Sequence, residues 1–260
     1  LRYLGPSFRA QGVHELLGIS DGEYKARPDE YTTAIVGNAT VRWIRKHTRT
    51  PGEDGDAVQR PPWFVMMAPK AAHEPFTPAP WHADAWEEGW PLHEPRPAGV
   101  WNATGDDKHG ALRTNPHMTS RAAEVVSGVF RNRWRTLRSV DDAVASVVEA
   151  CFYELEHTYI LFTSDHGFTL GEYNILMDKR HAYDFDTRVP LLVRGPGIAP
   201  GSILEQMVTL VDLAPTLLEM AGVDRTTAAA AGMDSIDGRS LLPLLTGRGD
   251  ATTWRDAVSK

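Results

Sequence analysis

The feature that most constrains the fold is the stretch from Thr158 to Gly197, in which two apolar runs flank a polar segment. The short apolar run from Tyr159 to Phe162 lies between turn signals and predicts a buried strand. Val189 to Val193 predicts a second buried strand, closed by a Gly-Pro-Gly turn. Directly after the first strand comes Ser-Asp-His-Gly, from Ser164 to Gly167. Ligands of open α/β sheets bind at the carboxyl ends of strands, so we expect a functional site here.

Asp165 and His166 are the candidate metal ligands of this segment, and Gly167 lets the backbone turn tightly beside them. A carboxylate suits a hard cation such as Ca²⁺, whereas an imidazole is more usual for transition metals. The simpler alternative is that both side chains only cap the following turn. The polar loop that follows carries three neighbouring basic residues, which suit an anionic substrate: Lys179, Arg180 and His181.

Periodic apolar residues predict helices in two other parts of the chain. In Glu30–Lys46, apolar positions at helical spacing predict an amphipathic helix. Helical spacing returns from Met118 to Glu156, where Ser139-x-x-Asp142 resembles a capping box that would restart the helix. Cys151 falls on the apolar face of this segment without a neighbouring base or cation, so we interpret it as a core residue.

The remaining segments complete an alternating pattern. Trp63 to Met67 predicts a central strand, and 69–117 predicts a long loop rich in Pro and Trp. A capped helix is expected from Asp212 to Gly222, and Thr226 to Ala231 is interpreted as a low-complexity linker. Because strands and helices alternate, we expect the α/β class, with a sandwich built on a mainly parallel central sheet.

The composition limits the classes of function. The 260 residues are 42% hydrophobic and carry a formal net charge of −7, which argues against non-specific nucleic-acid binding because that needs a basic face. A polyanionic substrate would therefore need a local cationic patch. No apolar run has the length of a membrane span, and no signal peptide is visible. The single cysteine excludes an internal disulfide.

The order of the motifs resembles the sulfatase family. SDHG is followed by a lysine in DKR and by the run FDTRVPLLVRGPG. Further blocks agree in order: HEP at His73, DKH at Asp107, RWRTLRSVDD at Arg133, VDLAPTLLEMAG at Val211 and DGRSLLPLLTG at Asp237. Within the family, the chain is most similar to N-acetylglucosamine-6-sulfatases and extracellular heparan endosulfatases, from about Tyr31 to Gly247.

The resemblance implies an alkaline-phosphatase-like sandwich. On this basis 1–260 is expected to be a partial sulfatase catalytic domain, with 69–117 as its long loop and 223–260 as a peripheral C-terminal segment. It also implies one Ca²⁺ ion held by Asp165 and His166, with further ligands from an N-terminal part that we expect to be missing.

The resemblance also implies roles for four further residues. His73 matches the histidine that touches the sulfate ester and can protonate the leaving alcohol, work that suits an imidazole near neutral pH. Lys179 matches the lysine that contacts the sulfate and stabilises the leaving oxygen. Lys108 and His109 match a Lys-His pair that contacts substrate. Arg180 is expected to be a surface residue.

One family motif is absent. Sulfatases use a formylglycine made from a Cys/Ser-x-Pro-x-Arg motif, whose hydrate attacks sulfur. Neither this motif nor the paired aspartates that precede it in the family have a match here. The resemblance implies the C-terminal part of a sulfuric ester hydrolase that removes 6-O-sulfate from N-acetylglucosamine or glucosamine units of glycosaminoglycans. Because the motif is absent, we expect the 260 residues to be inactive by themselves.

Two alternatives stay open. One is a phosphonate or phosphodiester hydrolase of the same superfamily. The other is a non-catalytic pseudo-sulfatase that binds sulfated glycans through Lys179, His73 and the Trp-rich loop. For an active sulfatase and for a pseudo-sulfatase alike, the expected partner is a sulfated carbohydrate or another sulfate ester. The resemblance also implies a lysosomal, secreted or cell-surface protein. Glycosylation sequons at Asn38 and Asn102 fit such a compartment, although two triplets also arise by chance.

Overall fold

The structure is a computed structural model that describes residues 7–10, 22–25, 27, 30–48, 61–87, 89, 96–223, 225–230, 232 and 236–255. The chain divides into two compact units. Unit 1 consists of Leu1–Tyr153 and His166–Val189, and unit 2 consists of Glu154–Asp165 and Pro190–Lys260. The boundaries between the units therefore fall after Tyr153, after Asp165 and after Val189.

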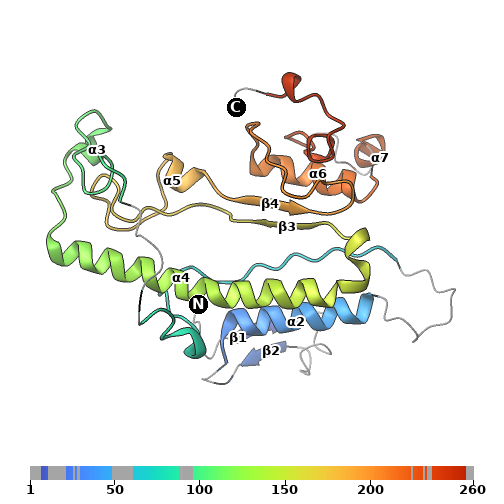
Figure 1. The fold of residues 1–260 in the computed structure, drawn as a ribbon, viewed down its shortest axis with the longest axis horizontal. Helices are drawn as coiled ribbons and strands as arrows, with labels where there is room; N and C mark the ends of the chain where they lie inside the picture. Colours follow the sequence, from blue (N-terminus) through green and yellow to red (C-terminus); the bar gives the residue numbers. More distant parts are fainter. Residues whose placement is uncertain are drawn as a thin grey trace. The chain divides into compact units, whose positions relative to one another are not determined.

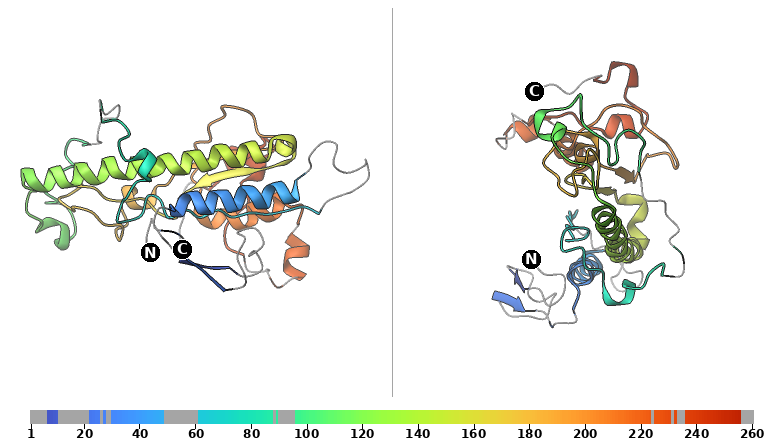
Figure 2. Two further views of the ribbon diagram at one scale, coloured as in Figure 1. Left: turned by 90° about the horizontal axis from the view of Figure 1, so that it is seen from below. Right: turned by 90° about the vertical axis from the view of Figure 1, so that its left-hand side faces the viewer.

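Unit 1 is built on two helices that lie side by side, α2 (Thr32–His47) and α4 (Ser120–Ala150) (Figure 1; Figure 2). Helix α2 confirms the helix predicted for Glu30–Lys46. Its buried residues form one face, as the apolar spacing predicted: Thr32, Thr33, Gly37, Val41 and Ile44. A Cβ atom at Gly37 would lie 2.9 Å from the Cβ of Ala143, so the close approach of the two helices depends on this glycine.

Helix α4 is one continuous helix rather than the two that the capping-box pattern suggested. It begins after Thr119, whose hydroxyl accepts a hydrogen bond from the Ala122 N–H at 3.2 Å. The predicted restart at Ser139 is wrong. Ser139 is buried inside the helix, because the apolar face around Val140 continues through this turn. Cys151 follows the last turn and is buried, which confirms it as a core residue.

The remaining elements of unit 1 are short. Strands β1 (Ser7–Ala10) and β2 (Gly22–Lys25) pair antiparallel. The long segment between α2 and α4 has little regular structure where it is described. It contains the 3-10 helix η1 (Pro80–His82) and α3 (Gly110–Arg113). Helix α5 (Asp184–Thr187) lies near the end of the unit.

The central strand predicted for Trp63–Met67 is not formed, so this prediction is wrong. The segment is extended, and exposed and half-buried residues alternate along it as they would along a strand. Phe64 is 66% exposed and Met66 is 81% exposed. A strand requires a hydrogen-bonded neighbour, and the segment pairs with no strand among the described residues.

Unit 2 contains both strands predicted around the central motif, but they are not buried as predicted, since Phe162 is 40% exposed and Leu192 is 60% exposed. Strand β3 (Ile160–Thr163) pairs with β4 (Leu191–Arg194), with Ile160 opposite Arg194 and Thr163 opposite Leu191. The two strands are antiparallel. The mainly parallel sheet that we expected is therefore not formed by the described strands, since both of their pairs run antiparallel.

The rest of unit 2 is helical. It contains part of η2 (Phe152–His157), then η3 (Leu210–Asp212), α6 (Leu213–Met220), α7 (Arg225–Ala230), α8 (Leu242–Leu245) and η4 (Ala251–Thr253). Helix α6 confirms the predicted helix but not its cap, because the Asp212 side chain makes no capping hydrogen bond to it. The linker predicted from Thr226 to Ala231 is wrong over 226–230, because the alanines there are strong helix formers and lie in α7.

The core of unit 2 is a small apolar cluster. Leu241, Leu244 and Trp254 are buried in it, and further apolar side chains pack around them: Leu191, Val208, Leu213 and Leu245. The cluster joins β4 to the helices that follow it. In the described part of the chain, no helix is long and apolar enough to cross a membrane.

Candidate functional site

The predicted metal ligands lie directly after β3. Asp165 is exposed, with the Ser164 hydroxyl 3.5 Å from its Oδ1. His166 is half-buried, and its Nδ1 lies 2.7 Å from the carbonyl oxygen of Gly167. A carbonyl oxygen can only accept, so we assign the proton to Nδ1. The lone pair of the neutral imidazole is then on Nε2, the nitrogen that can bind a metal or accept a proton.

The described residues do not form a complete calcium site. Ca²⁺ takes 6–8 oxygen ligands, and Asp165 and His166 supply one carboxylate and one imidazole. No group of three or more His, Cys, Asp or Glu side chains gathers around a possible metal position in the part of the chain that the structure describes. We therefore derive no chemical step through a metal.

The segment after His166 is paired with the end of its own loop. The N–H groups of Gly167 and Phe168 donate to the carbonyl oxygens of Asp186 and Phe185, both at 2.7 Å. A Cβ atom at position 167 would lie 2.0 Å from the Phe185 carbonyl oxygen. Gly167 is therefore required for the close approach of two backbones, which adds a second reason for glycine to the tight turn that we expected.

Asp186 holds this loop together, and the sequence analysis missed it. The side chain is 4% exposed. Its Oδ1 accepts a hydrogen bond from the Thr169 hydroxyl, and its Oδ2 accepts one from the His181 N–H, both at 2.8 Å. The signal in the sequence was an aspartate within the run AYDFDTRVPLL, which reads as an ordinary surface charge until its partners are seen.

Lys179 is presented by the same loop with its ammonium group available. The Asp178 carboxylate accepts a hydrogen bond from the Lys179 main-chain N–H at 2.7 Å, and the same oxygen lies 3.8 Å from Nε of Arg180. The Lys179 side chain is half-buried and makes no hydrogen bond or ion pair with the described residues. Arg180 is 86% exposed, as expected for a surface residue.

His73 lies in a turn of the long segment before α4. Its N–H donates to the carbonyl oxygen of Lys70 at 2.9 Å, and its Nδ1 lies 3.1 Å from the carbonyl oxygen of Glu74. The imidazole is exposed. Partial burial lowers the pKa of the neighbouring Lys70 side chain, and the Glu74 carboxylate opposes this shift. Lys70 is a second cationic group at this turn that the sequence analysis did not identify.

Arg133 of α4 ties the His73 turn to the segment after His166. Its guanidinium lies 4.1 Å above the Phe168 ring and 5.8 Å from the Phe76 ring, and it donates to the Ala72 carbonyl oxygen at 3.4 Å. The Phe76 and Phe168 rings meet edge to face, with centroids 5.9 Å apart. The structure thus brings the segments that carry His73 and His166 onto one aromatic cluster.

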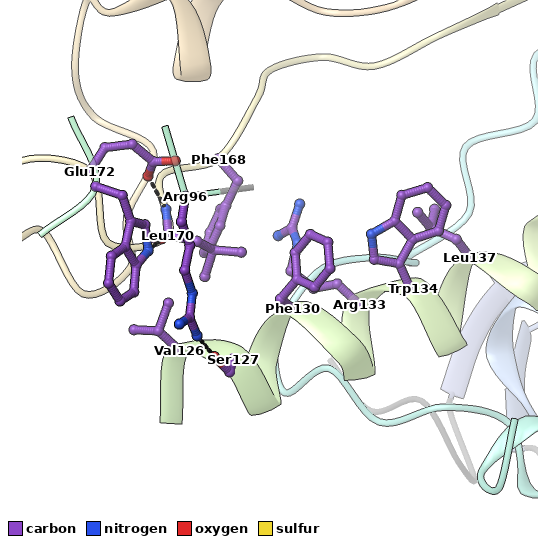
Figure 3. Close-up of a pocket in the computed structure, with 11 residues that line it drawn as sticks. Arg96, Val126, Ser127, Phe130, Arg133, Trp134, Leu137, Phe168, Leu170 and Glu172 are labelled. Atoms are coloured by element: carbon purple, nitrogen blue, oxygen red, sulfur yellow. Dashed lines mark hydrogen bonds between the residues drawn. The ribbon is translucent and has the colours of Figure 1, made fainter. Parts of the chain in front are cut away.

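The cavity on this side of α4 is a packing feature rather than the predicted site (Figure 3). It has a volume of about 270 Å³ and lies between α4 and residues 168–172. Its polar groups have partners: Arg96 donates to the Ser127 hydroxyl at 2.6 Å, and Glu172 accepts from the Leu170 N–H at 2.6 Å. None of the six predicted site residues lines it.

Lys108 and His109 lie against the loop that carries Lys179. The Lys108 ammonium donates to the Asp107 carboxylate at 2.6 Å and lies 5.4 Å from the centre of the Tyr173 ring. The hydrogen bond to Asp107 raises the pKa of Lys108, and the same bond lowers the pKa of Asp107. His109 is exposed, and its carbonyl oxygen accepts from the Leu112 N–H at 2.9 Å.

Comparisons with known proteins identify the family of the chain. A family model described as Sulfatase matches residues 23–223. The N-acetylglucosamine-6-sulfatase of Homo sapiens is 40% identical over 200 residues, which cover 76% of this chain and 34% of that protein. The N-acetylglucosamine-6-sulfatase of Bos taurus is 38% identical over 232 residues, 88% of this chain and 38% of that protein. The extracellular sulfatase SULF-1 homolog of Drosophila melanogaster is 33% identical over 232 residues, 88% of this chain and 19% of that protein.

Two solved structures share the fold. One, from Bacteroides fragilis and described as a sulfatase, superposes with a TM-score of 0.63 at 19% identity, over 88% of this chain and 44% of that one. A 2-O GAG sulfatase gives a TM-score of 0.50 at 19% identity, over 92% of this chain and 50% of that one. The chain spans 34% and 38% of the length of the two N-acetylglucosamine-6-sulfatases. With its alkaline-phosphatase-like α/β fold and its matching sequence blocks, the chain belongs to the sulfatase family.

Proposed function

We propose that this chain contributes to an active site that hydrolyses sulfate esters, and that its substrate is 6-O-sulfated N-acetylglucosamine in glycosaminoglycans. The substrate is supported by the 40% identity to a relative named for this reaction. The observation that carries the proposal is the ammonium group of Lys179, which has no hydrogen-bond or ion-pair partner among the described residues.

The loop around Lys179 supports an anion-binding role for this ammonium group. The Asp178 carboxylate, next to Lys179 in the chain, is engaged with a main-chain N–H and with Arg180. Asp186 of the same loop is buried and bonded to neutral donors. An ammonium held on a fixed loop without an internal counter-ion can stabilise the negative charge that develops on a sulfate ester as it is cleaved.

His73 and the Lys108–His109 pair take the remaining roles in the proposal. His73 presents an exposed imidazole that can protonate the leaving alcohol. Lys108 and His109 contact the anionic sugar. The Cys/Ser-x-Pro-x-Arg motif does not occur in the 260 residues, so we assign no nucleophile within them. Ca²⁺ bound by Asp165 and His166 stays a prediction, as do further ligands from other residues.

We also propose that the protein works in the lysosome, outside the cell or at the cell surface. A relative that is 33% identical is named an extracellular sulfatase. Glycosylation at the two sequons stays a prediction. Asn38 is exposed but lies within α2, and the Asn102 side chain accepts a hydrogen bond from the Met118 N–H at 2.7 Å.

Binding of N-acetylglucosamine 6-sulfate to the purified chain tests the proposal. We expect Lys179→Met to weaken binding about tenfold or more, since it removes a charge-assisted contact. Arg180→Met is the matched control, because Arg180 is the cation next to Lys179 and is 86% exposed. This substitution should change binding less than about twofold. Equal affinity for the sulfated sugar and for unsulfated N-acetylglucosamine would contradict the proposal.

The second candidate is a protein that binds sulfated glycans without turnover. This candidate also binds the sulfate through Lys179, but it releases no sulfate when hydrolysis is assayed. A phosphonate or phosphodiester hydrolase is separated from both by its ligand. That function predicts tighter binding of a phosphate ester than of the matched sulfate ester, and loss of this preference in Lys179→Met.

A further inference from the structure

A group of aromatic rings surrounds Lys108. The Tyr173 and Tyr183 ring centres are 5.7 Å apart, and Tyr183 stacks on Phe185 at 5.3 Å with an interplanar angle of 28°. The His181 ring centre lies 6.5 Å from that of Tyr183. The Lys108 ammonium lies 5.4 Å from the Tyr173 ring centre. Both tyrosines are half-buried.

The backbone holds Tyr173 in an unfavourable conformation. Tyr173 and Asn174 have φ angles of 48° and 61°, in the left-handed region that disfavours residues with side chains. Hydrogen bonds to the neighbouring segment fix them there. The Tyr173 N–H donates to the Val100 carbonyl oxygen at 2.8 Å, and the Asn174 amide donates to the Ala103 carbonyl oxygen at 2.9 Å. Strain of this kind persists where the surroundings over-determine it and clusters at functional sites.

Several polar groups of this cluster have no internal partner. Within the described residues, neither tyrosine hydroxyl makes a hydrogen bond. The Asn174 side chain is 7% exposed, and its Oδ1 is buried without a donor in the described part of the chain. The two tyrosine hydroxyls are therefore open to polar partners that a ligand supplies, whereas the Asn174 oxygen is sealed from solvent.

We propose that Tyr173 and Tyr183 form a stacking surface for the pyranose ring of a sulfated sugar, with Lys108 beside them to bind its anionic group in exchange for the exposed Asp107 carboxylate. An aromatic face with an adjacent ammonium complements a ring that has an apolar face and one negative substituent. The tyrosine hydroxyls pair with the hydroxyls of the sugar. The inference rests on the proposed function for the identity of the sugar, and it adds two residues that recognise the ring rather than the sulfate.

The test compares two ligands, N-acetylglucosamine 6-sulfate and N-acetylglucosamine, by isothermal titration calorimetry on the 260-residue chain. Tyr183→Leu removes the ring and should weaken binding of both sugars by a similar factor, about three- to tenfold. Tyr183→Phe keeps the ring and should stay within about threefold, the effect of one hydroxyl. Lys108→Met should weaken only the sulfated sugar. The matched control is Tyr153→Leu, because Tyr153 is 65% exposed and lies outside the cluster.

The outcomes separate this inference from the proposed function. If the wild type prefers the sulfated sugar but Tyr183→Leu behaves like Tyr153→Leu, the stacking surface is overturned and the proposed function stands. If both sugars bind equally and Tyr183→Leu weakens both, the stacking surface stands and the sulfate specificity fails. Absence of binding of either sugar overturns the inference.

Circular dichroism shows whether each variant folds. A second measurement on the wild-type chain keeps the inference testable if a variant does not. A sugar stacked on a tyrosine ring has its ring protons shifted upfield by the aromatic ring current. We expect these shifts in the proton NMR spectrum of N-acetylglucosamine 6-sulfate with wild-type chain, and smaller ones with Tyr173→Leu. Unchanged sugar shifts at saturating chain would overturn the proposal.

Discussion

The loop of unit 1 that carries Lys179 and the corner of unit 2 near Arg255 are each organised around one buried aspartate, and they differ in how its charge is met. Asp186 is bonded to a hydroxyl and a main-chain N–H. Asp212 is fully buried, and its Oδ1 accepts hydrogen bonds from Nη2 of Arg255 at 2.7 Å and from the Arg239 N–H at 2.8 Å.

The difference separates a structural use of charge from a functional one. In the unit 2 corner, an arginine and a carboxylate satisfy each other and leave no charge for a ligand. In the unit 1 loop, neutral donors satisfy Asp186, so its carboxylate does not pair with Lys179. The Lys179 ammonium is thereby kept for an external anion. This contrast is consistent with the anion-binding role proposed for Lys179.

The largest effect is expected from breaking the ion pair of unit 2. Asp212→Ala leaves Arg255 without its buried partner and should lower the free energy of unfolding by about 3–5 kcal/mol. Urea denaturation of the chain measures this change. Asp141→Ala, an exposed aspartate on α4, is the control and should stay within about 0.5 kcal/mol of wild type. A loss below about 1 kcal/mol for Asp212→Ala would show that the ion pair is not the support of this corner.

A smaller loss is expected at the neutral counterpart. Asp186→Ala strands the Thr169 hydroxyl and the His181 N–H, which should cost about 1–3 kcal/mol of unfolding free energy. The His181 amide should also exchange faster with deuterium, and sulfated sugar should bind more weakly because the Lys179 loop loosens. Unchanged exchange at His181 would contradict the role assigned to Asp186.

Lys179 should matter for binding and not for stability. Lys179→Met removes a side chain without an internal partner in the described residues, so the free energy of unfolding should change by less than about 0.5 kcal/mol. The same variant should lose affinity for N-acetylglucosamine 6-sulfate. Destabilisation as large as that of Asp186→Ala would place Lys179 among the structural charges instead.

The smallest effect concerns the pH dependence of the exposed pair Asp107–Lys108. Their hydrogen bond raises the pKa of Lys108 and lowers the pKa of Asp107. The contribution of Lys108 to stability is lost as the pH rises through its pKa in the folded state. The contribution of Asp107 is lost as the pH falls through its own pKa in the folded state. Between about pH 5 and pH 9 both are charged. The Tm difference between wild type and Lys108→Met should therefore be small and constant over this range, and a slope would contradict the pairing.

Local patterns in the sequence predicted the positions of most of the longer helices and of the two strands of unit 2. The spacing of apolar residues located α2 and α4, start and stop signals located α6, and apolar runs between turn signals located β3 and β4. Which strands pair, and in which direction, is set by contacts between distant parts of the chain. A local pattern of apolar residues holds no information on those contacts. The segment Trp63–Met67 has the pattern of a strand, but a pattern cannot supply a neighbour for it.

The site was predicted as residue types and not as a network. Motif order pointed to Lys179 and His73, which the resemblance singles out. Asp186 and Arg133 were missed as functional supports because a charged residue in a sequence reads as solvated unless its partners are known. Their roles depend on contacts with residues far away in the chain, such as Thr169 for Asp186 and Ala72 for Arg133.

The most direct test of the central claim is hydrolysis by a chimera. Residues 23–223, which match the family model, replace the corresponding segment of the Homo sapiens N-acetylglucosamine-6-sulfatase, which supplies the rest of that protein. We predict that the chimera releases sulfate from N-acetylglucosamine 6-sulfate, that Lys179→Met abolishes release while Arg180→Met does not, and that the 260-residue chain alone shows none. A folded chimera with formylglycine in place that releases no sulfate would contradict the account.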